Sequence, residues 1–211
     1  MKKYMAEFMA TFVLIFCGTG AAIVNEVRNG VITHVGIAMV FGLIVMAMIY
    51  AFGEISGSHM NPAVTIAFAV QKVFPANQVI PYIISQVAGA VAASYCLKFL
   101  FPDSQFLGAT IPSGSILQSW VLEFFLTFIL MLTVLNVADK GKEKGLLAGL
   151  AIGAVVLVEA MFAGPVSGAS MNPARSFAPA LVSGNVQYIW IYVTAPIAGS
   201  ISSVFIFRLM N

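Results

Sequence analysis

Apolar residues fill most of the chain in long runs that charged residues hardly interrupt. Residues 29–53, 73–97 and 176–207 contain no Asp, Glu, Lys or Arg. A helix needs about 20 mainly apolar residues to cross the hydrocarbon core of a bilayer. Each of these runs is therefore long enough to hold a membrane span.

The same pattern predicts six spans and two shorter apolar segments. We expect the spans at residues 4–24, 34–53, 79–101, 115–137, 145–163 and 187–209. The shorter segments, near 61–71 and 172–183, each open with Asn-Pro-Ala. A helix of about 10 residues is about 15 Å long, half the thickness of the hydrocarbon core. The predicted fold class is an all-α polytopic membrane protein with six transmembrane helices and two re-entrant half-helices.

Composition supports a membrane protein and argues against several other classes. Apolar residues make up 60% of the chain and charged residues only 9%, with a mean hydropathy of +0.98. A soluble domain carries roughly a quarter charged residues. The net charge of +2 gives no indication of a nucleic-acid partner. We find no metal-ligand cluster and no nucleophile paired with a base, so neither a cofactor nor an enzyme activity is expected.

Basic residues are distributed unequally between the two sides of the predicted membrane layout. The side of the termini carries Lys2, Lys3, Lys72, Lys140, Lys142, Lys144 and Arg208. The opposite side has Arg28 and Lys98, with Arg175 after the second Asn-Pro-Ala. The positive-inside rule therefore predicts a multi-pass protein of the cell (plasma or inner) membrane with both termini in the cytoplasm.

The two halves of the chain repeat each other. Residues 7–12 match residues 123–128 at four of six positions, and residues 56–63 match 167–174 at six of eight. Each half has three crossings, an odd number, so the second half must be inverted relative to the first. We expect one channel domain over 1–211, built from inverted repeats at 1–101 and 115–211.

Both Asn-Pro-Ala motifs read as helix starts. Asn is a favoured N-cap, and Pro fits the first turn because it lacks the N–H that would go unsatisfied there. An Asn whose oxygen caps the helix keeps its NH₂ group to donate to a passing water. Two positive helix ends at mid-membrane would also repel cations, including a hydrated proton. The predicted pore motifs are Asn61, Pro62, Ala63, Asn172, Pro173 and Ala174.

The loops before these motifs would be non-helical at membrane depth, which is tolerated only where backbone is buried or lines a wet cavity. We expect them to line the pore with carbonyl groups of Gly57, Ser58, His59, Met60, Gly168, Ala169, Ser170 and Met171. Glu7 and Glu123, placed alike in the two repeats, would be costly facing lipid. We expect each to accept backbone N–H groups from a loop, in preference to relaying protons.

These motifs resemble those of the major intrinsic protein family, the aquaporins and glycerol facilitators, over essentially the whole chain. The resemblance implies a right-handed helical bundle with one pore per subunit, usually assembled as a homotetramer. It also implies passive passage of water and small uncharged solutes, with ions and protons excluded. Gly149-x-x-x-Gly153 suits the close helix packing that such a bundle needs.

The resemblance further implies a four-residue selectivity filter, formed here by Phe41, Ala160, Ala169 and Arg175. Water-specific members typically have His at the Ala160 position, and glycerol facilitators have Asp where this chain has Ser176. An aromatic/Ala/Ala/Arg filter is most similar to the nodulin-like intrinsic proteins and their bacterial relatives. Members of that group pass water, glycerol and neutral metalloid acids. We therefore expect a wide filter for water with glycerol, urea or metalloid acids, and a strictly water-selective channel is the alternative.

Two acids depart from the family pattern. Glu54 stands where the family usually has His, near one mouth, where it would attract cations, titrate as a gate or be solvated. Glu159 is about 100° around its helix from Ala160, and we expect it either to brace the Arg175 loop or to be protonated and buried. An ion-coupled secondary transporter is the alternative from another class, since inverted repeats with broken helices also describe such folds.

Overall fold

The computed structural model describes residues 1–138 and 141–211, without the side chains of residues 138–146. Every regular element in these ranges is helical. In chain order the elements are α1 (Lys2–Val27), α2 (Thr33–Ser56), α3 (Pro62–Val70), the 3₁₀ turn η1 (Ala76–Gln78), α4 (Val79–Leu100), α5 (Ile116–Ala138), α6 (Gly141–Ser167), α7 (Pro173–Ser183) and α8 (Ile189–Met210). The side chains of Lys140, Lys142 and Lys144, which contribute to the predicted orientation, lie outside the described part.

Six of these helices, α1, α2, α4, α5, α6 and α8, are long and apolar enough to cross a membrane. The other two, α3 and α7, have 9 and 11 residues, which confirms the predicted six spans and two half-helices. Several spans are longer than predicted, such as α1, which continues to Val27, and α6, which continues to Ser167. Hydropathy detects only the apolar part of a helix, whereas the hydrogen-bonded ladder continues into its polar ends.

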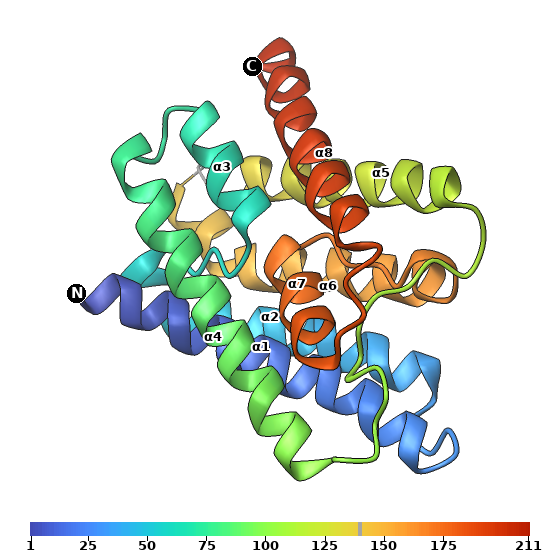
Figure 1. The fold of residues 1–211 in the computed structure, drawn as a ribbon. Helices are drawn as coiled ribbons and strands as arrows, with labels where there is room; N and C mark the ends of the chain where they lie inside the picture. Colours follow the sequence, from blue (N-terminus) through green and yellow to red (C-terminus); the bar gives the residue numbers. More distant parts are fainter. Residues whose placement is uncertain (139–140) are drawn as a thin grey trace.

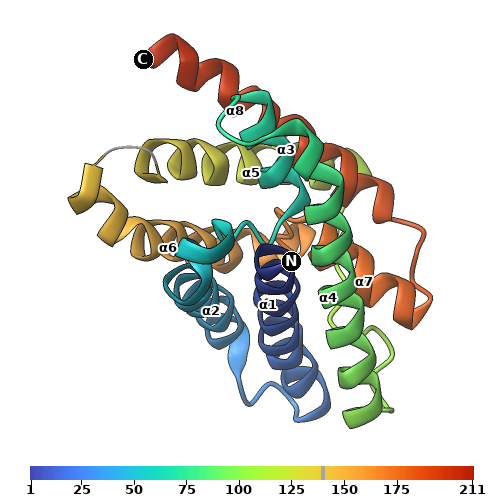
Figure 2. The ribbon, with the colours of Figure 1, turned by 90° about the vertical axis from the view of Figure 1, so that its left-hand side faces the viewer.

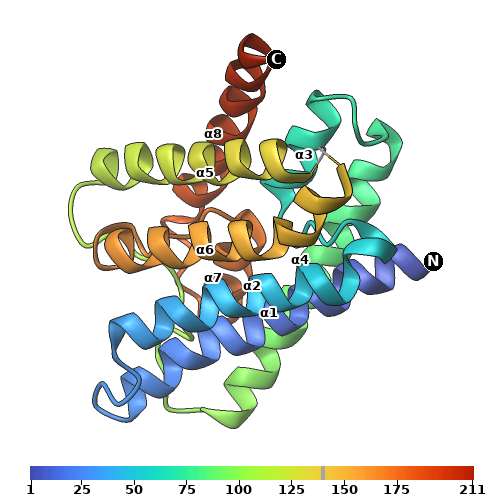
Figure 3. The same cartoon turned by 180° about the vertical axis from the view of Figure 1, so that it is seen from behind.

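The six long helices and the two half-helices form one bundle (Figure 1). Seen from behind, α5, α6, α2 and α1 lie side by side in that order (Figure 3). Helix α4 packs against α1, and α8 packs against α5. The half-helices complete the bundle, because both α3 and α7 contact α4 and α8 (Figure 2).

Glycines allow equivalent close crossings in the two halves. A Cβ atom on Gly89 of α4 would lie 2.2 Å from the carbonyl oxygen of Phe8 in α1. A Cβ atom on Gly199 of α8 would lie 2.1 Å from the carbonyl oxygen of Phe124 in α5. At both crossings one backbone packs directly on the other, so any side chain would force the helices apart.

A third crossing joins the halves. A Cβ atom on Gly42 of α2 would lie 2.6 Å from the Gly153 carbonyl oxygen, and the reverse distance is also 2.6 Å. Gly149 faces the same helix, since its Cβ atom would meet the ring of Tyr50. The Gly149-x-x-x-Gly153 spacing therefore packs α6 against α2 inside one subunit.

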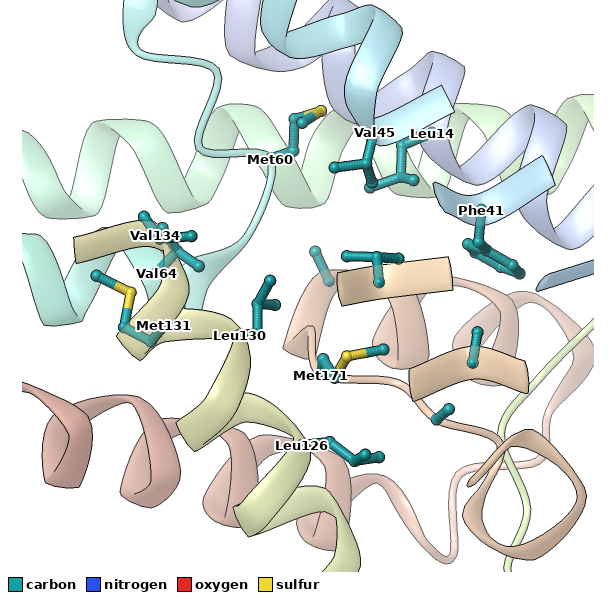
Figure 4. Close-up of a cluster of buried hydrophobic side chains, with 14 of the residues drawn as sticks. Leu14, Phe41, Val45, Met60, Val64, Leu126, Leu130, Met131, Val134 and Met171 are labelled. Carbon is teal, nitrogen blue, oxygen red and sulfur yellow. The ribbon is translucent and has the colours of Figure 1, made fainter. Parts of the chain in front are cut away.

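Buried apolar side chains from the spans and the half-helices form one main core (Figure 4). Met60 and Met171, from the loops that precede α3 and α7, belong to this core. A smaller cluster of Ile23, Leu97, Leu107 and Val182 holds part of the connection between α4 and α5 against the bundle. The core therefore surrounds both loops and fixes where they lie.

Candidate functional site

Both half-helices begin with the predicted cap. Asn61 has extended backbone angles, and its Oδ1 accepts from the Ala63 N–H at 2.9 Å. Asn172 does the same with the Ala174 N–H at 3.0 Å. Pro62 and Pro173 follow in the first turn, where no amide hydrogen is needed.

The two Asn side chains also tie the loops to each other. Asn61 Nδ2 donates to the Met171 carbonyl at 2.8 Å, and Asn172 Nδ2 donates to the Met60 carbonyl at 2.8 Å. An amide NH₂ has two hydrogens, so each Asn keeps only one of them for a permeating molecule. Since both Asn side chains line the same cavity, these hydrogens are donors at the meeting point of the half-helices.

The loops before the two caps share an unusual backbone path. Three residues in each have positive φ angles, with values of 85°, 47° and 52° in the first loop and 87°, 43° and 55° in the second. These residues are Gly57, Ser58 and Met60, and Gly168, Ala169 and Met171. Only glycine adopts such angles without strain, so the other four residues need support from their surroundings.

Glu7 supplies that support to the first loop. Its carboxylate accepts from the backbone N–H groups of His59 and Met60 at 2.8 and 2.9 Å. It also accepts from Ser56 Oγ at 2.7 Å and from Gln86 Nε2 at 2.8 Å. All four donors to this fully buried carboxylate come from the loop, the end of α2 or the neighbouring helix α4, so its hydrogen bonds are made within the bundle.

Glu123 occupies the equivalent place in the second half. It accepts from the Ser170 and Met171 N–H groups at 2.8 and 2.9 Å, and from Ser167 Oγ at 2.7 Å. Both acids thus hold two consecutive backbone donors of a loop. A carboxylate with such partners fixes the loop carbonyls on the opposite side of the backbone, toward the cavity.

A cavity of about 340 Å³ lies along the two loops. All four residues of the predicted filter line it: Phe41, Ala160, Ala169 and Arg175. So do the predicted loop residues Gly57, Ser58, His59, Met60, Ser170 and Met171. Gly168 is not among the lining residues, and a Cβ atom there would lie 2.8 Å from Thr110 Cγ2.

The remaining wall of the cavity is apolar. It is formed by Leu14, Val45, Ile49, Gly53, Val64, Phe68, Leu130, Val134, Ala148, Ile152 and Val156, several of which are visible in Figure 4. Polar groups are therefore confined to the loops, the two Asn side chains and Arg175. A wall that is largely apolar with a limited set of polar groups suits small neutral molecules, which hydrogen-bond to those groups and meet apolar surface elsewhere.

Arg175, in the first turn of α7, is buried and lies between two groups. Its Nη1 donates to the Gly108 carbonyl at 2.7 Å, and the guanidinium carbon lies 4.9 Å from the centre of the Phe41 ring. The first contact fixes the plane of the guanidinium, and the second is a cation–π contact. Gly108 belongs to the connection between α4 and α5, which no motif in the sequence had singled out.

The structure contradicts the predicted direct bracing of the Arg175 loop by Glu159. Glu159 is only 3% exposed, and neither carboxylate oxygen has a hydrogen-bond partner among the described residues. The groups it was expected to bind are already engaged, Arg175 by the Gly108 carbonyl and the loop N–H groups by Glu123. Glu159 is instead a buried, unpartnered acid next to a filter residue.

Glu54 lies in the last turn of α2 with its side chain exposed. Gly53 lines the cavity, whereas Glu54 is not among the lining residues. Its carboxylate is therefore directed away from the described pore wall, and a gating role for it remains a prediction from the sequence alone.

Comparison with known proteins identifies the family of this chain. Residues 1–207 match the family described as Major intrinsic protein. The chain belongs to this family. It is accordingly a transmembrane channel for water and small uncharged solutes, and neither an enzyme nor an ion-coupled secondary transporter.

Individual relatives confirm the predicted similarity to nodulin-like proteins. Aquaporin NIP1-1 of Oryza sativa subsp. japonica is 46% identical over 212 residues, which cover the whole chain and 75% of the relative. Nodulin-26 of Glycine max is 44% identical over 213 residues, covering the whole chain and 77% of the relative. The solved structure of the aquaglyceroporin from Plasmodium falciparum has a TM-score of 0.89 at 24% identity, over 99% of this chain and 96% of that one. This last likeness shows a common fold.

Proposed function

We propose that this channel passes neutral solutes larger than water, such as glycerol, urea or neutral metalloid acids, in addition to water. The observation that carries the proposal is the presence of two alanines, Ala160 and Ala169, among the four filter residues lining one cavity. An alanine side chain is a single methyl group, so two of the four sides of the filter leave room. Arg175 donates to a solute oxygen, and the Phe41 ring faces its carbon atoms.

Charge exclusion rests on different groups. The capped N-terminal ends of α3 and α7 face the cavity, and each carries about half a positive charge. Arg175 adds a full positive charge on the same wall. A cation or hydrated proton would meet all three, whereas a neutral solute interacts with them only through hydrogen bonds. Ion exclusion and solute size are thus separate properties of one pore.

The test is a solute panel on the purified channel in proteoliposomes, followed by stopped-flow light scattering. The wild type should take up glycerol, urea and boric acid as well as water. Ala160→His should reduce glycerol uptake by about tenfold and water flux by less, because added bulk in a pocket discriminates by size. Ala160→Val adds less bulk at the same position, and its glycerol uptake should lie between those of the wild type and Ala160→His. A wild-type channel that passes water alone would contradict the proposal.

Assembly and orientation belong to the same proposal: a homotetramer in the cell membrane with both termini in the cytoplasm. The basic residues Lys2, Lys3, Lys72 and Arg208 near one end of the bundle support the orientation. Light scattering on the detergent-solubilised protein gives the subunit number. The native cysteines, Cys17 and Cys96, are first replaced by Ser. In that background a membrane-impermeant thiol reagent applied to intact cells should leave a Lys2→Cys variant unlabelled, and labelling there would reverse the orientation.

A further inference from the structure

The connection between α4 and α5, residues 101–115, contributes two groups to the filter. The Gly108 carbonyl holds Arg175, as described above. Two residues further on, the buried Thr110 Oγ1 donates to Ser176 Oγ at 2.7 Å. Adjacent residues of α7, Arg175 and Ser176, are therefore each fixed by the same short segment.

The Thr110 hydroxyl is the first member of a buried chain that ends in the pore loop. Ser176 Oγ lies 2.5 Å from Ser170 Oγ, and Ser170 Oγ donates to the Asn172 carbonyl at 2.9 Å. Because the last acceptor is a carbonyl, the donors run in one direction, from Thr110 through Ser176 and Ser170 to Asn172. Ser170 lines the cavity, so the chain connects the segment 101–115 to the pore wall.

The methyl group of Thr110 contacts the same loop at a second point. A Cβ atom on Gly168 would lie 2.8 Å from Thr110 Cγ2, so the methyl packs directly on the glycine backbone. Gly168 has a φ angle of 87° and begins the strained part of the loop. One side chain thus touches the loop with its methyl group and fixes it through its hydroxyl.

In the first half of the chain the equivalent loop is held by a donor from helix α4. There Gln86 Nε2 donates to Thr65 Oγ1 at 2.9 Å, and Thr65 Oγ1 lies 3.1 Å from His59 Nδ1. Thr65 and His59 correspond in the repeat to Ser176 and Ser170. Gln86 belongs to α4, three residues before Gly89, and the residue three before Gly199 in α8 is Pro196.

Proline has no side-chain donor, so α8 cannot supply what Gln86 supplies from α4. Thr110 provides the missing donor from outside the repeat.

The segment that carries Thr110 is itself held firmly. Leu107 is buried in the cluster with Ile23, Leu97 and Val182. Ser104 Oγ donates to Glu26 Oε2 at 2.8 Å and accepts from the Leu107 N–H at 3.2 Å. Because the segment is anchored at Ser104 and Leu107, the positions of Gly108 and Thr110, which follow directly, are also fixed.

We propose that Thr110 is a positioning residue of the selectivity filter. It holds Gly168 and Ser170 in the loop, and Ser176 in α7, at a fixed distance from the Arg175 guanidinium that Gly108 orients. A solute with several hydroxyl groups needs the loop carbonyls and Arg175 in register at the same time. Water forms fewer simultaneous bonds and tolerates a shifted loop. Thr110 therefore acts on selectivity more than on water flux.

The experiment compares two variants that separate the two parts of the side chain. Thr110→Val keeps the branched shape and removes the hydroxyl, whereas Thr110→Ser keeps the hydroxyl. In proteoliposomes Thr110→Val should lower the ratio of glycerol to water permeability by about fivefold, the effect of roughly one hydrogen bond. Thr110→Ser should stay within about twofold of the wild type. Gln105→Ala, which shortens an exposed side chain of the same segment, is the control and should leave the ratio unchanged.

The glycerol readout rests on the proposed wide filter, so a second readout is measured on the same vesicles. The activation energy of water permeability should rise in Thr110→Val and stay at the wild-type value in Thr110→Ser. If the wild type excludes glycerol, the proposal of a wide filter is wrong, and the activation energy of water permeability alone tests the positioning role of Thr110. Equal changes in both variants, or a Thr110→Val channel identical to the wild type in both readouts, would overturn the assignment. Parallel loss of all fluxes would also overturn it, since that indicates a general structural role.

Discussion

The loops at residues 56–61 and 167–172 follow the same backbone path and differ in side chain at two positions, Ser58 against Ala169 and His59 against Ser170. Both have positive φ angles at the same three places, and both are held by a buried Glu through two consecutive N–H groups. A Tyr hydroxyl donates to the carbonyl of the first Ser in each, from Tyr82 at 2.9 Å and from Tyr192 at 2.7 Å. These duplicated contacts act on the backbone of the two loops.

The side chains that differ give the two halves of the pore different chemistry. His59 of the first loop packs among the rings of Phe68, Phe74 and Tyr82, with ring centres 4.8 to 5.2 Å away. Ser170, its counterpart, takes part in the hydroxyl chain instead. In the half-helices, Val64 and Arg175 occupy equivalent positions, and both line the cavity. The repeat thus builds both half-helices and both loops of the pore, whereas three of the four predicted filter residues, Ala160, Ala169 and Arg175, come from the second half and only Phe41 comes from the first.

The largest expected effect comes from removing the charge that holds each loop. Glu123→Gln must turn its NH₂ toward the Met171 N–H, which leaves two donors facing each other in a buried site. We expect a loss of about 1–3 kcal/mol in stability, the cost of a buried donor without an acceptor. Glu7→Gln should lose about 1 kcal/mol more, because Gln86 Nε2 also faces the new amide.

The midpoint of thermal unfolding in detergent measures both changes, and water flux should fall in the same order. A conservative exchange, Glu123→Asp, keeps the charge and serves as the control for shape. Equal losses in Glu7→Gln and Glu123→Gln would mean that Gln86 contributes nothing, and the first loop would then be held no more firmly than the second.

The next effect should be equal in the two halves. Gly89→Ala and Gly199→Ala each place a Cβ atom about 2 Å from a carbonyl oxygen of the neighbouring helix. We expect both to lose about 1–3 kcal/mol, as overpacked sites do, with the same lowering of the unfolding midpoint. Gly53→Ala is the control, since nothing lies within 4 Å of a Cβ atom there. Clearly unequal losses would show that one crossing tolerates separation and the other does not.

Much of this architecture can be predicted from the sequence because its causes are local or repeated. Uncharged runs of more than 20 residues predict three of the spans, mainly apolar runs with a single Glu predict the other three, and Asn-Pro predicts the two helix starts. The roles of Glu7 and Glu123 follow from their equivalent positions in an inverted repeat. In each case the residue type and its position in the chain leave few other structures that a membrane would tolerate.

The remaining features depend on contacts that no spacing encodes. Gly108 and Thr110 lie in a connection without regular structure, and the repeat has no counterpart for them. Only the folded chain shows that Pro196 replaces the donor Gln86 and that Thr110 supplies it. Likewise the sequence left two alternatives open for Glu159. The structure contradicts bracing of the Arg175 loop, because the expected partners are bound to other groups, and it agrees with a buried side chain.

The smallest expected effect is a gain in stability from making the second half more like the first. Glu159 lies eight residues before Ser167, and the residue eight before Ser56 is Met48, which packs against the main core. Burying an acid without a partner costs free energy, and a side chain of similar length and no charge avoids that cost. Glu159→Met should therefore raise stability by about 1 kcal/mol and raise the unfolding midpoint, with water flux unchanged. The reverse exchange in the first half, Met48→Glu, should lower the midpoint. A lower midpoint for Glu159→Met would mean that the carboxyl group has a partner in the working channel, such as an internal water, that compensates for its burial.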